Sequence, residues 1–531
     1  MAERIVVIGA GIGGLASAAL LAKDGYEVTL LEANDQVGGR AGSWEKDGFR
    51  FDTGPSWYLM PEVFDHFYKL MGTSAAEQLD LHLLDPGYRV YFESKNSPAD
   101  YVDIRSDKQA NLQVFESLEP GSKEAMEKYL ASAKDTYDIA KKYFLYTSFA
   151  KLGPLLVGDV LKRLGTLYSL LTRPIMEFAG RYVKSWRAKQ LLGYPAVFLG
   201  SSPYIAPAMF HLMSYLDLED GVLYAQGGFT RVMESIRDLG VQHGVNLVLN
   251  ARVTDILTTK LPGDGKARVR GVAYLDQTGK RHEADADIVV SAADLHHSET
   301  TFLPQDLQTY PESYWDTKTA GPSAVLLYLG VEGEVPELLH HTLFFTEDWE
   351  DNFGKIFAKK PTPPNPASLY VCKPSETDPN VAPKGDTNIF VLVPMPADPT
   401  MGRGGIDGNG DALIETIADR AIEQIATWSG ATDLASRIKV RRTVGPADFQ
   451  GYLNAWKGSA LGPAHTLAQS ALFRSGNISK KVQGLFYAGS STIPGIGLPM
   501  CLISAELVVK RLRNDHSTTP LAEPLRPTKV S

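Results

Sequence analysis

Three glycines near the start of the chain stand at a spacing that suits dinucleotide binding. Gly9, Gly11 and Gly14 form a G-x-G-x-x-G pattern between an apolar run and an alanine-rich stretch. In such a turn the first glycine permits a tight bend, the second lets the backbone approach the pyrophosphate, and the third lets the helix pack closely on the strand. Gly13 lies in the same turn, where N–H groups at the helix start can hold the phosphates. The pattern predicts a strand, a phosphate-binding turn and a helix.

An acidic residue at the end of a second apolar run supports this interpretation. Residues 28–31 have the composition of a strand, and Glu32 follows them at the spacing at which a carboxylate binds the ribose hydroxyls. An isolated G-x-G-x-x-G pattern is also found in glycine turns that bind nothing. The order of elements here, which is strand, turn, helix, strand and acidic residue, favours a dinucleotide-binding unit over a glycine turn without a ligand.

Gly38-Gly39-Arg40 follows the second strand, and Gly54-Pro55-Ser56 comes shortly after it. These segments resemble those of the FAD-dependent amine oxidase and phytoene desaturase superfamily, and in particular those of bacterial-type phytoene desaturases. Near the other end of the chain, Gly489-Ser490 and Gly497-Leu498-Pro499 are similar to the flavin-binding signature that closes carotenoid desaturases. The resemblance covers the whole chain and implies that its two ends build one FAD site.

The resemblance also implies roles for single residues. It places Arg40 near the pyrophosphate and flavin, where a guanidinium can hold an anion, and it places Val253 against the adenine. Asp52 is either part of this site or a cap of the following turn. Ser490-Ser491 and Met500-Cys501 stand where many relatives have smaller residues, which leaves the substrate and the number of reaction steps open. The expected cofactor residues are Gly9, Gly11, Gly13, Gly14, Glu32, Gly38, Gly39, Arg40, Gly54, Pro55, Ser56, Val253, Gly489, Ser490, Gly497, Leu498 and Pro499.

We expect an α/β protein with a discontinuous Rossmann-like FAD-binding domain, an α+β substrate-binding lobe and a helical membrane-associating region. A chain of 531 residues is too long for one simple core. The order of the elements assigns residues 1–90, 225–300 and 475–515 to the FAD-binding domain, 91–224 to the helical region, 301–474 to the sheet lobe and 516–531 to a disordered tail.

Hydrophobic periodicity predicts the elements of the middle of the chain. A helix over 231–243 and a strand over 246–250, continued by 252–256, precede strands over 271–274 and 287–292, of which the last returns to the dinucleotide sheet. The runs 325–331, 368–372 and 388–394 predict the sheet of the second lobe. Residues 411–428 have helical spacing, with an apolar face formed by Leu413, Ile417, Ala421 and Ile425.

Charge and cysteine usage argue against a nucleic-acid-binding protein and against a disulfide-stabilised one. A net charge of −9 and a pI near 5.7 argue against nucleic acid as the main partner, because phosphate binding needs a basic surface. Cys372 and Cys501 are far apart in the sequence, so we expect buried thiols in a reducing cytoplasm and no disulfide.

The sequence offers no further site that we can assign. The pairs 296–297 and 340–341 are adjacent histidines with no carboxylate or cysteine at ligand spacing, so we predict no metal site. No catalytic triad or pair of carboxylates is recognisable either, and the catalytic residues stay unknown.

Residues 143–192 differ from the rest because apolar and basic side chains are interleaved there. A basic amphipathic stretch of this kind can lie on an anionic membrane surface, and it can equally form a helical cap whose lysines are solvated. The resemblance favours peripheral contact with the cytoplasmic face of the cell membrane. The basic residues in and next to this stretch are Lys141, Lys142, Lys151, Lys162, Arg163, Arg173, Arg181, Lys184, Arg187 and Lys189.

The resemblance implies an activity. It predicts FAD-dependent desaturation of phytoene, a hydrophobic polyene precursor, to neurosporene or lycopene, with oxygen or a membrane quinone as the electron acceptor. A carotenoid cis–trans isomerase with FAD is an alternative, and an amine oxidase is a less favoured one. An alternative of another class is a lipid carrier without redox activity, like the GDP-dissociation inhibitors of Rab GTPases.

Overall fold

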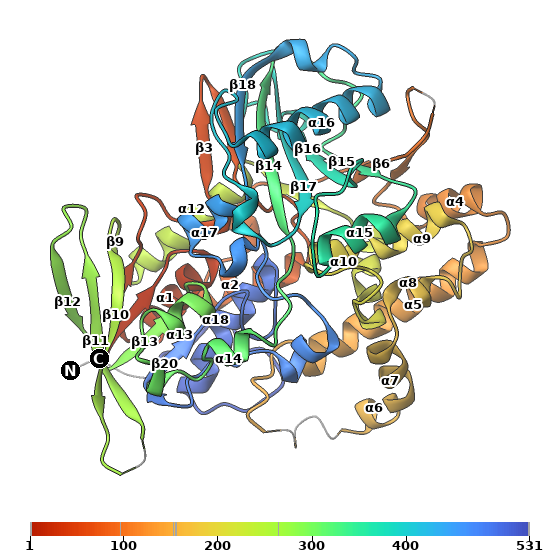
Figure 1. Cartoon of the computed structure of the whole chain (residues 1–531). Coiled ribbons are helices and arrows are strands. Elements are labelled where there is room, and N and C mark those ends of the chain that lie inside the picture. Colours follow the sequence, from red (N-terminus) through yellow and green to blue (C-terminus); the bar gives the residue numbers. More distant parts are fainter. Residues whose placement is uncertain (1–2, 96, 152, 154–156, 264, 529–531) are drawn as a thin grey trace.

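A five-stranded parallel sheet brings together strands from three distant parts of the chain (Figure 1). The computed structural model describes residues 3–528 except 96, 152, 154–156 and 264. Because its strands come from separate parts of the chain, the predicted dinucleotide sheet is discontinuous as expected. The strand expected over 287–292 does return to this sheet. The strands, in spatial order, are β20 (Leu485–Tyr487), β13 (Ile288–Ser291), β1 (Arg4–Ile8), β2 (Glu27–Leu31) and β9 (Asn246–Val248).

Both faces of this sheet are covered, which explains why its strands are apolar throughout. Helices α1 (Ile12–Lys23), α12 (Gly228–Gln242) and α18 (Leu498–Leu512) contribute to one core cluster with Ile5 and Val7 of β1. Val6 and Ile8 point to the opposite face, where a smaller antiparallel sheet packs. Its antiparallel strands are β10 (Arg252–Lys260), β11 (Ala267–Leu275) and β12 (Arg281–Asp285), and the short β19 (Val482–Gln483) joins β11 in parallel.

One expected continuation was wrong. Residues 252–256 do not extend the preceding strand: β9 pairs with β2 in the parallel sheet, whereas β10 pairs with β11 in the antiparallel sheet. Asn250 separates the two strands with φ = 54°, a left-handed conformation that turns the chain and that asparagine tolerates better than most residues.

The second lobe is built on a seven-stranded mixed sheet. The three predicted strands form β14 (Ser323–Val331), β16 (Leu369–Cys372) and β17 (Thr387–Met395), and the predicted helix forms α16 (Ala412–Ser429). Leu413 is 42 % exposed, so it is not part of the buried helix face. The strand order is β18 (Ile438–Val444), β14, β17, β16, β15 (His341–Phe345), β6 (Tyr88–Phe92) and β7 (Tyr101–Ile104).

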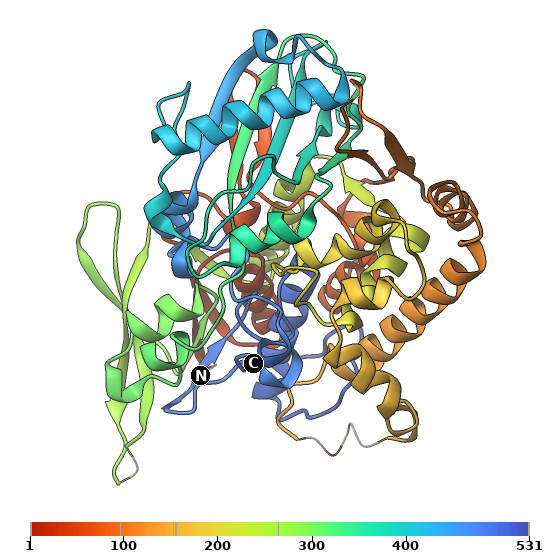
Figure 2. The same cartoon turned by 45° about the vertical axis from the view of Figure 1, so that its right-hand side comes forward.

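The sheet of the second lobe has one helix-covered face and one face directed toward the centre of the molecule. Helix α16 lies across the outer face (Figure 2) and packs with alternate residues of β14 and β17. The other alternate residues, such as Leu326 and Phe390, belong to a cluster shared with the helices of the middle of the chain. The inner face of this sheet is therefore available to line an internal site.

The helical part of the chain is shorter than the expected 91–224, because β6 and β7 join the sheet of the second lobe. We call residues 108–220 the helical region; it lies on the side of the molecule opposite β10–β12 (Figures 1 and 2). Among the described residues, no helix is both long and apolar enough to cross a membrane. The helical region contains α4 (Lys108–Leu118), α5 (Lys123–Ile139), the π-helical turn Ala140–Phe144, α6 (Gly158–Leu161), α7 (Leu164–Thr172), α8 (Ile175–Ala179), α9 (Trp186–Gly193), α10 (Pro195–Phe198) and α11 (Met213–Tyr215).

Shorter elements connect the layers. Additional strands are β3 (Ser43–Lys46), β4 (Phe49–Asp52), β5 (Leu81–Leu83) and β8 (Leu223–Ala225). Additional helices are α2 (Pro61–Met71), α3 (Ala75–Gln78), α13 (Leu295–Thr300), α14 (Glu312–Trp315), α15 (Trp349–Phe357) and α17 (Pro446–Leu453).

The C-terminal tail, which we expected to be disordered, follows the surface of the lobe built on the parallel sheet up to residue 528. Leu525 is only 2 % exposed, and its N–H donates to the Leu70 carbonyl at 3.0 Å. Thr528 N–H donates to the Asp24 carboxylate at 2.8 Å, which also accepts from Arg513. The polar composition of the tail favours disorder. A few buried or hydrogen-bonded residues compensate for the conformational entropy that is lost when the tail is ordered.

Candidate active site

The glycine turn between β1 and α1 has the geometry that its spacing predicts. A Cβ atom at Gly14 would lie 1.8 Å from the Gly9 carbonyl oxygen, so only glycine lets the helix approach the strand this closely. Gly9 has φ = +90°, which favours glycine. At Gly11 the nearest atom to such a Cβ is the Gly38 carbonyl oxygen at 4.0 Å. The backbone at Gly11 is therefore open on the side where a pyrophosphate would approach.

The two ends of the sequence meet at this turn. A Cβ atom at Gly13 would lie 3.1 Å from Cα of Gly489, although 476 positions separate the two residues. Gly489 N–H donates to the Ser504 hydroxyl of α18 at 3.1 Å. The N-terminal and C-terminal glycine motifs thus form two adjacent walls of one site.

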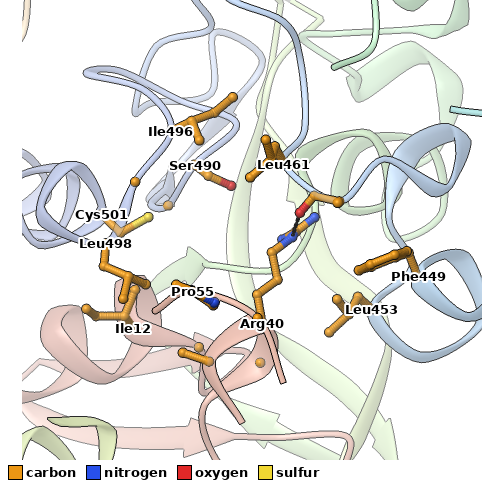
Figure 3. Close-up of a pocket in the computed structure, with 18 of the residues that line it drawn as sticks. Ile12, Arg40, Pro55, Phe449, Leu453, Leu461, Ser490, Ile496, Leu498 and Cys501 are labelled. Carbon is orange, nitrogen blue, oxygen red and sulfur yellow. Dashed lines mark hydrogen bonds between the residues drawn. The ribbon is translucent and has the colours of Figure 1, made fainter. Parts of the chain in front are cut away.

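All but one of the expected cofactor residues line a single cavity of about 970 Å³. In Figure 3, Ile12, Leu498 and Cys501 lie on one side of this cavity, Phe449 and Leu453 lie on the other, and Arg40 extends between them toward Leu461. Gly14 is the exception, because it packs against Gly9 behind the turn. The residues brought together are Gly9, Gly11, Gly13, Glu32, Gly38, Gly39, Arg40, Gly54, Pro55, Ser56, Val253, Gly489, Ser490, Gly497, Leu498 and Pro499.

Glu32 and Arg40 occupy different parts of the cavity wall. The Glu32 carboxylate is 6 % exposed and accepts hydrogen bonds from Ala10 N–H at 2.6 Å and from Asn34 N–H at 2.9 Å. Arg40 Nε donates to the Ala460 carbonyl at 2.7 Å (Figure 3), which leaves its terminal nitrogens for other partners. Burial lowers the pKa of Arg40, but an arginine pKa stays far above neutral pH.

The geometry of the site is by itself compatible with dinucleotide binding. Helix α1 begins at Gly11 without a side-chain cap and without an acidic residue in its first turn. Such a helix start presents free N–H groups and a positive dipole end to an anion. Glu32 and Val253 of β10 line the same cavity as this helix start, so the residues present fit a dinucleotide such as FAD.

Comparison with known proteins agrees with this geometry. The family model for flavin containing amine oxidoreductases matches residues 12–513. The chain belongs to this family. As a flavin oxidoreductase it uses FAD, and a non-redox carrier is not favoured.

Individual proteins of similar length allow a more detailed comparison. This oxidoreductase is 39 % identical to a carotenoid 3,4-desaturase of Haloarcula japonica over 97 % of this chain and 98 % of the relative. It is 31 % identical to a 4,4'-diapophytoene desaturase of Staphylococcus haemolyticus over 96 % and 99 %. Putrescine oxidase bound to putrescine shares the fold, with a TM-score of 0.62 at 15 % identity over 97 % of this chain and 99 % of that structure.

The cavity of the oxidoreductase continues beyond the dinucleotide residues into an apolar space that we did not predict residue by residue. Its walls come from the inner face of the second sheet, from the helical region and from α17, which are far apart in the sequence. The apolar runs of β14 and β17 indicated a sheet in this lobe, but they did not show which side chains face inward. Apolar lining residues include Tyr137, Phe144, Leu145, Phe149, Val197, Phe210, Met213, Leu326, Leu343, Phe345, Leu369, Leu392, Phe449 and Leu453.

Asp52 does not line the main cavity and caps a helix. Its carboxylate accepts from Phe229 N–H at 2.6 Å and from the Thr230 hydroxyl at 2.7 Å, at the start of α12. Burial raises the pKa of Asp52, and these hydrogen bonds oppose that shift. Asp52 therefore caps the start of α12, which is distant in the sequence, and not the turn that directly follows it.

A buried arginine ties the C-terminal glycine segment to the preceding loop. Arg474 donates to the carbonyls of Thr492 at 3.1 Å, Gln469 at 3.1 Å and Ser490 at 2.5 Å. It is 6 % exposed, and burial lowers its pKa to about 10, so it stays charged at neutral pH. Arg474 thereby fixes the backbone that carries Ser490.

Both cysteines are buried and free, as expected, and burial raises the pKa of each thiol to about 12. No cysteine stands at ligand spacing from a histidine pair in the sequence, but one lies beside such a pair in the fold. Cys372 of β16 pairs with His341 of β15, and ligand-type atoms of His340, His341 and Cys372 lie within 4.8 Å of one another. Sequence spacing could not show this, because 30 residues lie between His341 and Cys372.

Proposed function

We propose that this flavin oxidoreductase desaturates a carotenoid precursor. The observation that carries the proposal is the apolar continuation of the dinucleotide cavity. A hydrocarbon offers no charge or hydrogen-bonding group, so its binding must rest on shape and on buried apolar area, at about 25 cal/mol per Å². FAD supplies a two-electron acceptor for a hydride, and the protein positions the carbon chain beside it.

The substrate is phytoene in this proposal, and the product is a more conjugated carotene such as neurosporene or lycopene. The diapophytoene desaturases among the relatives support a substrate of this class. A second candidate is oxidation at the 3,4-bond of a carotene that is already conjugated, which the 39 % identity to a carotenoid 3,4-desaturase favours. In either case the electrons pass from the reduced cofactor to oxygen or to a membrane quinone.

Pigment formation in bacteria tests the proposal. We expect lipid extracts of a phytoene-accumulating strain that expresses the protein to gain new absorption bands at longer wavelength, because each added double bond extends conjugation. New bands only in a lycopene-accumulating strain would assign the 3,4-bond instead. Unchanged conjugation in both strains, with soluble and flavin-loaded protein, would contradict desaturation, and a changed double-bond geometry at constant conjugation would indicate an isomerase.

We also propose that the helical region contacts the cytoplasmic face of the cell membrane, from which a hydrocarbon substrate must come. Tyr137, Phe144 and Phe149 of this region line the cavity, while Leu161 and Tyr168 are 47 % and 71 % exposed. The basic charge is partly balanced locally. Ion pairs join Lys141–Glu62, Lys142–Asp159, Arg163–Asp135, Arg173–Glu177 and Arg187–Asp100.

Because of these pairs, apolar contact should contribute more to membrane binding than charge does. We expect the wild type to float with vesicles that contain phosphatidylglycerol, and the variant Leu161→Asp with Tyr168→Asp to bind at least ~10-fold more weakly, since each apolar side chain contributes about 1.5–3 kcal/mol when buried. Leu413→Asp on α16, at the other end of the molecule (Figure 1), is the control. Wild-type protein that stays in the soluble fraction would contradict the proposal.

A further inference from the structure

His465 lies in the cavity wall beside the C-terminal glycine segment. It is 4 % exposed, and it lines the cavity together with Leu199, Phe210 and Ile496. The Phe210 ring meets the imidazole edge-on at a centroid distance of 5.3 Å. The imidazole is thus held between the helical region and the segment that carries the flavin-binding glycines.

One hydrogen bond fixes the tautomer of this histidine. Nδ1 lies 2.9 Å from the Leu199 carbonyl oxygen. A carbonyl can only accept, so Nδ1 carries the hydrogen and Nε2 of the neutral ring has a free lone pair. Burial, together with the charge of Arg474, lowers the pKa of His465 to about 3, which keeps the ring neutral before any reaction.

The free nitrogen is directed at the glycine segment. A Cβ atom at Gly495 would lie 2.5 Å from Nε2, and Gly495 has φ = +149°. Its neighbours Pro494 and Ile496 both line the cavity. Within the described part of the chain, no hydrogen bond to Nε2 is found. The structure therefore presents an unprotonated imidazole nitrogen at the flavin end of the cavity.

Two carboxylates that line the cavity already accept hydrogen bonds from backbone N–H groups. The Asp448 carboxylate accepts from Gly404 N–H at 2.7 Å, and that of Asp294 accepts from His297 N–H at 3.2 Å. His297 itself lies beside Phe302, in the wall that includes Val253. Among the described residues, His465 is the histidine that joins the C-terminal glycine segment to the apolar part of the cavity.

We propose that His465 is the group that accepts the proton in the desaturation, an inference that rests on the proposed function. One C–H bond of the substrate breaks with transfer of a hydride to FAD, which leaves an allylic cation on the chain. The neighbouring carbon then loses a proton to Nε2 of His465, and the electron pair of that C–H bond forms the new double bond. The imidazolium later releases this proton to water. A carbon acid next to a cation is strongly acidic, so a weakly basic imidazole suffices.

The variant His465→Asn separates this role from a structural one. The asparagine amide can still donate to the Leu199 carbonyl in place of Nδ1, but it has no group at Nε2. We expect a bound FAD content and a Tm close to those of the wild type, and a rate of product formation lower by about 100-fold, at the low end of what a general base contributes. Anaerobic bleaching of the flavin by substrate should slow as well, because the cation returns to substrate when the proton is not removed.

Two further variants keep the proposal testable if His465→Asn is poorly folded. Added imidazole should restore part of the activity of His465→Ala, a rescue that a structural role would not give. His211→Asn is the matched control, because His211 is also buried and bonded through Nδ1 to a carbonyl, that of Ala208 at 2.8 Å, but does not line the cavity. His465→Asn with a rate within about threefold of the wild type, or the absence of rescue, would overturn the proposal. Absence of product from the wild type would overturn the proposed function instead.

Discussion

Replacement of Gly14 with alanine is expected to abolish FAD binding. The new Cβ atom would lie 1.8 Å from the Gly9 carbonyl oxygen and 3.2 Å from Cβ of Ala292, so α1 would have to move away from β1. This displacement would shift the N–H groups at the start of the helix from the phosphate site. We expect a fall of about 3 kcal/mol in the free energy of unfolding and purified protein with less than roughly a tenth of the wild-type flavin absorbance.

The control for this substitution is a glycine in open space. Gly354 lies in α15, and no atom is within 4 Å of the position of an added Cβ. Gly354→Ala should retain its flavin and gain about 0.5–1 kcal/mol, because alanine favours the helix. A yellow, stable Gly14→Ala protein would show that the strand and helix can separate without loss of the site.

Replacement of Asp217 with asparagine is expected to change the pH dependence of stability. The Asp217 carboxyl is 4 % exposed and accepts hydrogen bonds from the hydroxyls of Tyr88 and Tyr194, while its second oxygen has no partner. Burial raises its pKa from 3.8 to about 7. Between these values the folded protein holds a proton that the unfolded chain has lost, so wild-type stability falls as the pH rises.

The size of the effect follows from that shift. A change of about three pKa units corresponds to about 4 kcal/mol over the whole range, and most of it falls between about pH 4 and pH 7. Asparagine cannot ionise, so the Tm difference between Asp217→Asn and the wild type should grow in favour of the variant as the pH rises. Glu124→Gln is the control, because Lys128 keeps the pKa of Glu124 low and this exposed group stays ionised throughout. A Tm difference that does not change with pH would contradict a raised pKa at Asp217.

Local patterns predicted the elements of the FAD-binding domain well. The G-x-G-x-x-G turn, Glu32 and the Gly38-Gly39-Arg40 segment lie within 40 residues, and their spacing is set by the βαβ unit itself. The central strands of the second lobe were also predictable, because β14 and β17 are apolar runs that are buried along almost their whole length. Where a tight local geometry needs glycine, the residue type alone identifies the position.

Features that depend on contacts between distant parts of the chain could not be predicted from the sequence. The tail was expected to be disordered from its composition, yet single anchors such as Leu525 and Thr528 order it through contacts with residues near the start of the chain. Composition does not show such contacts, because they depend on which surface the tail meets. The same holds for β6 and β7, which complete a sheet whose other strands follow more than 200 residues later.

The sequence by itself determined the dinucleotide-binding architecture, the cofactor segments and the apolar character of the substrate lobe, since each follows from short-range spacing, residue type or resemblance. Only the tertiary structure decided which residues share one cavity and which polar atoms inside it stay free. His465 is an ordinary loop histidine in the sequence, and its chemistry arises from the Leu199 carbonyl and from Gly495. The hydrogen-bond partners of a histidine determine which ring nitrogen carries the proton, and the fold determines those partners.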